Sequence, residues 1–170
     1  MLRQTMLPLL LFVAVLATGV AQADSVRVPK TGVPAFAFDT PAGWTILYDE
    51  FGNLRLTADD HTCALQLSII SDPAIGKTPL SELAAQIMKA AEARPFSKQS
   101  PGTIAGRKGT QFFSQITNEK GVAVTLGVTL VKLDASHVAS QATMKAEGMS
   151  HAQIAALNAL IARVRLTGVK

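Results

Sequence analysis

The longest strand pattern in the chain covers residues 122–133, which read VAVTLGVTLVKL. Large apolar residues occupy every second position from Val122 to Leu130, and smaller residues fill most of the positions between them. A period of two places these two sets on opposite faces of a β-strand. The larger set should therefore pack on a hydrophobic core.

Several shorter strand patterns lie on either side of this segment. In residues 63–69, for example, Leu65 and Leu67 alternate with Gln66 and Ser68, which is typical of a half-buried strand. Only short turns separate the strands, and short turns require antiparallel pairing because parallel pairing needs long crossovers. The expected strands are residues 35–38, 44–48, 53–57, 63–69, 108–117, 122–133 and 136–143.

Two helical stripes interrupt the strands. Residues 80–91 follow Thr78 and Pro79, a capping residue and a favoured first helical residue. Ser150 and Gln153 form a capping box before a second stripe that ends near Val164. The order of elements predicts the α+β class, with one antiparallel β-sheet and two helices packed on one face.

The amino terminus predicts export. A single charge, Arg3, precedes a short apolar run, and small residues at Ala21 and Ala23 follow it. This pattern is typical of a secretory signal peptide over residues 1–23, cleaved between Ala23 and Asp24. The alternative is a membrane anchor, but a transmembrane helix needs about 20 uninterrupted apolar residues. We therefore expect a periplasmic protein with no integral membrane segment after cleavage.

The remaining chain is the size of one domain, because removing 23 of 170 residues leaves about 147. Residues 24–34 are expected to be a flexible lead-in, since Pro29, Gly32 and Pro34 discourage regular structure. The single α+β domain should then cover residues 35–167. Cys63 is the lone cysteine, which excludes an intramolecular disulfide and favours a buried thiol.

Charge and motifs argue against several functions. The net charge is +4, but the cations are scattered, so no basic run fits a nucleic acid. Gly76-Lys77-Thr78 resembles the end of a phosphate loop, yet Ser71 stands where that motif requires glycine. Asp59, His61 and Cys63 alternate as zinc ligands can, but a fourth ligand is evident only at distant His137. We therefore expect no cofactor and no metal.

No catalytic group stands out either. The adjacent acids at 49–50 and 59–60 lie in expected turns, where carboxylates are normally solvated. No Gly-x-Ser-x-Gly motif is present, and nothing in the sequence ties a histidine to a serine. An enzyme would need a deep pocket in which His61 or His137 meets a carboxylate or a hydroxyl.

Two kinds of binding surface are candidates. Phe96 and Phe113 are the aromatic residues least committed to the expected core, and we assign them as partner-contacting residues. The small face of residues 122–133, which includes Thr125 and Gly127, can accept a helix of the same chain. The alternative is an open groove that receives a partner's peptide or helix.

Three segments carry a resemblance to a known family. Residues 36–44 (FAFDTPAGW), 104–110 (IAGRKGT) and 161–165 (IARVR) resemble the opening strand, the mid-chain glycine turn and the closing helix of the PsbP-like fold and its bacterial DcrB-type relatives. The likeness covers roughly residues 35–166.

That resemblance implies an accessory or binding role, because members of the fold include photosystem lumen subunits, a Ran-binding nuclear factor and secretion chaperones. It carries no shared catalytic residues. The combined expectation is an exported, periplasmic, non-catalytic accessory or binding protein whose partner is another envelope protein or a peptide. The alternatives are an envelope enzyme of hydrolase type and a peripheral protein that contacts anionic membranes through scattered Lys and Arg.

Overall fold

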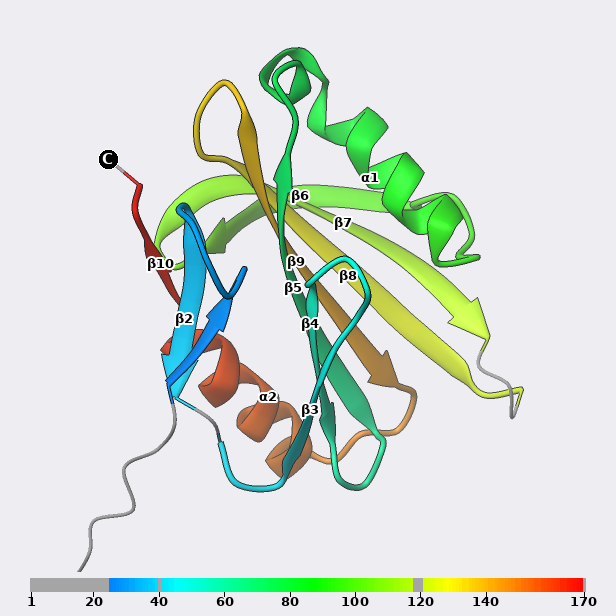
Figure 1. The fold of residues 1–170 in the computed structure, drawn as a ribbon. Helices are drawn as coiled ribbons and strands as arrows, with labels where there is room; N and C mark the ends of the chain where they lie inside the picture. Colours follow the sequence, from blue (N-terminus) through cyan, green and yellow to red (C-terminus); the bar gives the residue numbers. More distant parts are fainter. Residues whose placement is uncertain (1–24, 40, 118–120, 170) are drawn as a thin grey trace, which may run out of the picture.

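The computed structural model describes residues 25–39, 41–117 and 121–169 of the chain (Figure 1). The expected signal peptide, residues 1–23, and the expected cleavage site between Ala23 and Asp24 lie outside these residues. Among the described residues, no helix has the length and apolar character needed to cross a membrane.

A seven-stranded antiparallel sheet forms the centre of the molecule, in the order β3-β4-β5-β9-β8-β7-β6. The strand expected at 122–133 is β8, and it lies between β7 and β9 because turns join it to both. The strands are β3 Trp44–Tyr48, β4 Leu54–Ala58, β5 Cys63–Ser71, β6 Lys98–Ile104, β7 Arg107–Thr117, β8 Ala123–Lys132 and β9 His137–Ala146.

A second, three-stranded sheet has the order β1-β2-β10, formed by Ser25–Val28, Ala35–Asp39 and Arg165–Thr167. β1 falls inside residues 24–34, which the sequence predicts to be irregular. Val26 and Val28 instead alternate along β1 and pair with Phe38 and Phe36 of β2. The lead-in expectation is therefore wrong for residues 25–28, because a strand ends just before Pro29 without needing its N–H.

β6 is a second difference from the expectation, since residues up to Gly102 are expected to form a loop. Pro101 is tolerated there because β6 is an outer strand, where a missing backbone N–H breaks no ladder.

Two helices and one short 3-10 turn complete the fold. They are α1 Leu80–Ala90, α2 His151–Arg163 and η1 Ile75–Lys77. The capping box of α2 is confirmed, with Gln153 N donating to Ser150 Oγ and Ser150 N donating to Gln153 Oε1. α1 has no side-chain cap: Pro79 occupies its N-cap position, not the first helical position, and Thr78 does not cap it.

The α+β class with antiparallel pairing is confirmed, but the two helices contact opposite faces of the large sheet (Figure 1). Neighbouring side chains in a strand point to opposite faces. On β9, Val138 packs in the cluster with α1, whereas Ala139 packs in the cluster with α2. On β8, Leu130 packs in the cluster with α1 and Val131 in the cluster with α2, so this strand is apolar on both faces near its end.

Candidate functional site

A hollow of about 360 Å³ lies between the C-terminal half of α1 and the face of the large sheet that α1 covers. We call it the α1 hollow. Ile87, Ala90 and Ala91 line it from the helix, while β5, β8 and β9 supply its floor. The helical stripe of the sequence places Ile87 toward the sheet, and the small side chains that follow leave the space open.

The floor of the α1 hollow carries a short row of polar side chains, formed by Gln66 and Ser68 of β5 and Ser140 of β9. Ser68 and Ser140 are directly opposite each other in the antiparallel pair, which brings their Cβ atoms within about 5.5 Å. Ser140 is only 4% exposed. In the part of the chain that the structure describes, none of the three side chains makes a hydrogen bond. Gln66 and Ser68 are half-buried, and all three side chains border the open space of the hollow, so they are free to hydrogen-bond a group bound there.

Apart from Asn53, the walls of the α1 hollow are apolar, and they are uncharged. Ile70, Leu126, Ala142 and Met144 line it beside the helix residues, and no lining residue carries a formal charge. Its volume is at the lower end of the range for small-molecule sites, which are mostly apolar with a few placed polar groups. The arrangement therefore fits a neutral ligand that is largely apolar and has at least one hydrogen-bonding group.

A second hollow of about 240 Å³ continues along the same face of the sheet. Met144 lines both hollows. The second hollow is more polar at its far side, where Arg55, Thr57 and His61 contribute. Together the two hollows follow the direction of β5 and β9 across the exposed part of this face.

The alternating set Asp59, His61 and Cys63 does not come together. His61 lies in the turn before β5 with a positive φ of 57°, so it does not share a strand face with Cys63. Cys63 begins β5 and is buried, and burial raises the pKa of its thiol. Among the described residues no group of His, Cys, Asp or Glu is arranged to hold a metal.

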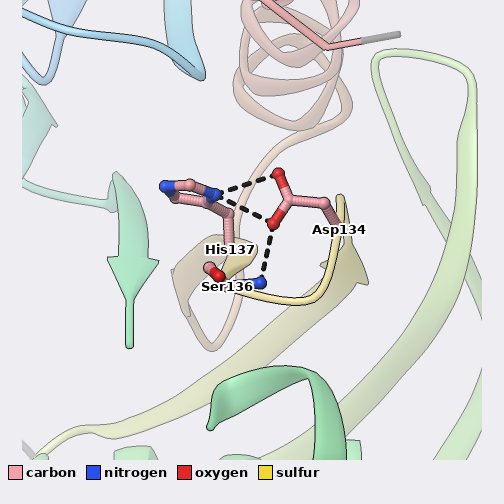
Figure 2. Close-up of polar contacts among 3 residues, drawn as sticks. All are labelled: Asp134, Ser136 and His137. Carbon is pink, nitrogen blue, oxygen red and sulfur yellow. Dashed lines mark hydrogen bonds and ion pairs between the residues drawn. The ribbon is translucent and has the colours of Figure 1, made fainter. Parts of the chain in front are cut away.

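His137 contacts a carboxylate, as the enzyme alternative requires. Its Nδ1 lies 2.9 Å from both carboxylate oxygens of Asp134, and Ser136 N donates to Asp134 Oδ1 over 2.7 Å (Figure 2). The hydrogen bond from Ser136 N, followed by that from His137, lowers the pKa of Asp134. Both side chains are partly exposed, and neither lines either hollow. Asp134 lies in the turn between β8 and β9, and His137 is the first residue of β9. The contact therefore stabilises the turn without forming a deep catalytic pocket.

Gly76 serves packing instead of phosphate binding. Its N–H donates to Ala135 O over 2.9 Å, and its own carbonyl accepts from Lys132 Nζ over 2.7 Å. A Cβ at Gly76 would lie 2.5 Å from Ala135 O, so only glycine permits this approach. The Gly76 amide that a phosphate would need is thus used within the protein.

Phe96 and Phe113 lie on opposite faces of the large sheet. Phe96 packs with α1 and meets Phe112 edge-on at a centroid distance of 5.1 Å. Phe113 follows Phe112 and points to the other face, where Lys98 Nζ lies 6.0 Å from its ring. The two residues therefore belong to separate surfaces, and their contact with a partner stays a prediction.

The small face of β8 is filled along part of its length. A Cβ at Gly127 would lie 3.0 Å from Thr143 Oγ1 and 3.5 Å from Gln111 Nε2. Thr129 is buried, whereas Ala123 and Thr125 are exposed. Side chains of neighbouring strands occupy the space next to Gly127, so the open site lies on the opposite face of β8. The sequence offered no signal for that site, because Gln66 and Ser68 match an ordinary solvent-facing pattern.

No protein-family profile and no curated protein matches this sequence. Three solved structures are similar in fold. They are the PsbP protein CyanoP of the cyanobacterium Synechocystis (12% identity, TM-score 0.53, covering 87% of this chain and 95% of that one), LpqN of Mycobacterium tuberculosis (14%, 0.51, 85% and 91%), and a protein of Bacteroides thetaiotaomicron (15%, 0.51, 77% and 44%).

LpqN is described as involved in cell envelope biogenesis. This chain spans less than half the length of the Bacteroides protein. At such low identities the likeness concerns the arrangement of the backbone. It confirms the resemblance read from the sequence: this chain has a PsbP-like fold.

Proposed function

We propose that this chain is an exported, non-catalytic binding protein of the periplasm whose ligand site is the α1 hollow. The observation that carries the proposal is a row of polar side chains, Gln66, Ser68 and Ser140, in the floor of a mainly apolar cavity. None of the three makes a hydrogen bond within the described part of the chain. An accessory or binding role is also what the PsbP-like resemblance implies, and LpqN, which shares the fold, is involved in cell envelope biogenesis. The ligand class is a neutral, mainly apolar molecule or side chain with a hydrogen-bonding group.

A binding assay with a neutral fluorescent probe tests this site. N-phenyl-1-naphthylamine is apolar, uncharged and carries one N–H, and its fluorescence rises in apolar surroundings. Ala91→Trp, at an exposed position that lines the hollow, should fill the cavity and weaken probe binding about tenfold or more. Ser81→Trp is the matched control, because Ser81 is exposed on the same helix and does not line the hollow.

Equal probe binding by the two tryptophan variants would show that the probe binds elsewhere and would overturn the assignment. The same holds if the folded wild-type protein binds no probe.

Export is tested separately. Mass spectrometry of the protein from fractionated cells should find a periplasmic species that begins at Asp24. An intact chain in the cytosol would contradict the export part of the proposal and leave the binding site untouched.

The hydrolase alternative rests on one contact, that between Asp134 and His137. An active hydrolase would hydrolyse p-nitrophenyl acetate and lose this activity in His137→Ala. We expect no turnover above background in either protein, because the pair is partly exposed at the start of β9 and lines neither hollow.

A further inference from the structure

β3 is an outer strand of the large sheet and pairs with β4 alone. Its ladder shows which backbone groups are in use. Gly43 O accepts from Asp59 N over 3.1 Å at one end, and Asp49 N donates to Asn53 O over 3.0 Å at the other. Hydrogen-bonded pairs alternate in an antiparallel ladder, so Thr45 and Leu47 also bond to β4.

The alternate residues of β3 direct their backbone groups away from β4. The N–H and C=O groups of Trp44, Ile46 and Tyr48 therefore face the free edge. Within residues 25–39, 41–117 and 121–169, no hydrogen bond reaches these six groups. The edge is a continuous template for one more strand.

The opposite edge of the same sheet is protected, and β3 is not. β6 carries Pro101, which has no N–H, and Lys98, a charge that disfavours pairing with another strand. β3 reads WTILY and contains neither a proline nor a charge. Leu47, which is 58% exposed, adds an apolar side chain next to the open edge.

We propose that β3 pairs antiparallel with β3 of a second copy of this chain, with the twofold axis at Ile46. The outward-facing residues Trp44, Ile46 and Tyr48 are symmetric about this point, so a centred antiparallel pair uses every free backbone group of both strands. Trp44 of each copy then opposes Tyr48 of the other, and aromatic cross-strand pairs are favourable. This assembly is independent of the α1 hollow.

Charge is compatible with this self-pairing. In the same register Asp49 opposes Gly43 of the second copy, and Glu50 opposes Ala42, so no like charges are paired within the ladder. Lys30 Nζ lies 4.2 Å from the centre of the Tyr48 ring, which places a cation beside the pair of Trp44 and Tyr48. Thr45 opposes Leu47. A five-residue ladder buries less than the roughly 1,000 Å² of a stable interface, so the dimer is weak and concentration-dependent.

Two double variants test both the contact and its register. Thr45→Glu with Leu47→Glu places glutamates opposite each other across the twofold axis, whereas Thr45→Lys with Leu47→Glu places lysine opposite glutamate. Both side chains are exposed, and circular dichroism checks that each variant is folded. Sedimentation velocity from about 10 µM to about 1 mM should show a dimer for the wild type and the Lys/Glu variant. The Glu/Glu variant should dissociate about tenfold more readily or further.

Amide hydrogen exchange gives a second readout. Protection of the Ile46 N–H should rise with protein concentration, while the Leu47 N–H, which faces β4, should not change. A wild type that stays monomeric at about 1 mM would overturn the proposal and leave the edge to an extended peptide of another protein. Equal dimerisation of the two charge variants would overturn it as well, because the dimer would then form elsewhere.

Discussion

The two faces of the seven-stranded sheet are covered to very different extents. One face packs against both α2 and the three-stranded sheet, and Phe36, Leu65 and Leu67 there are fully buried. On the other face the main cover is α1, with Ile75 of η1 and Phe96 beside it. α1 has 11 residues and is about 16 Å long, whereas seven strands span about 29 Å. One short helix cannot cover that width. The difference explains why the hollows lie on the α1 face and why polar groups remain unpaired in its floor.

Leu67→Ala should have the largest effect, because it truncates a fully buried side chain on the face that α2 and the three-stranded sheet cover. We expect a loss of about 2–5 kcal/mol in the free energy of unfolding, measured by urea denaturation. Met144→Ala, on the face with the hollows, should cost less than about 2 kcal/mol, since Met144 already borders open space. Equal losses in the free energy of unfolding at the two positions would show that the two faces are packed equally well.

Gly76→Ala tests how the segment before α1 is anchored. The new Cβ would meet Ala135 O at 2.5 Å and force the loop off the turn between β8 and β9. We expect a loss of about 1–3 kcal/mol in thermal or urea unfolding. Ala74→Gly, at an exposed residue of the same loop, is the control and should change stability by less than about 1 kcal/mol. If Gly76→Ala has full stability, the loop is not held by this contact.

Two buried serines on the α1 face form a matched pair. Ser114, 3% exposed, donates its hydroxyl to Arg94 O, whereas Ser140, 4% exposed, has no hydrogen-bond partner within the described chain. Ser114→Ala should lose about 1 kcal/mol, and Ser140→Ala should be within about 0.5 kcal/mol of the wild type. Urea denaturation without ligand measures both. A larger loss at Ser140 would show that its hydroxyl is satisfied and would remove the main support for the α1 hollow.

The smallest effect is expected at Asp60, which links the start of β5 to α2. Hydrogen bonds from Thr62 and from Gln153 lower its pKa to about 2. The folded pKa lies below the ordinary value of 3.8 for an aspartate, so the stabilisation is present above about pH 4 and is lost as the pH falls toward 2. Asp60→Asn should flatten this part of the stability–pH curve in thermal unfolding.

Much of the fold could be predicted from the sequence, but the site could not. The capping box at Ser150 and the alternation through 122–133 are local patterns, and local patterns determine whether a segment forms a helix or a strand. Ser140 lies in an expected strand, yet its burial depends on Ser68 of another strand and on α1, which is distant in the chain. A hollow has no periodicity of its own, so no sequence pattern marks it.

The sequence alone determined that the strands pair antiparallel, because their turns are too short for crossovers, and that two amphipathic helices must pack on sheets. Only the tertiary structure decided which face each helix covers. Leu130 and Val131 are both apolar, so β8 offers a core-forming surface on either side, and only the packing of all elements assigns α1 to one and α2 to the other. Tertiary structure likewise decided that β3 lies at the edge of the sheet, because strand order depends on pairings between distant segments.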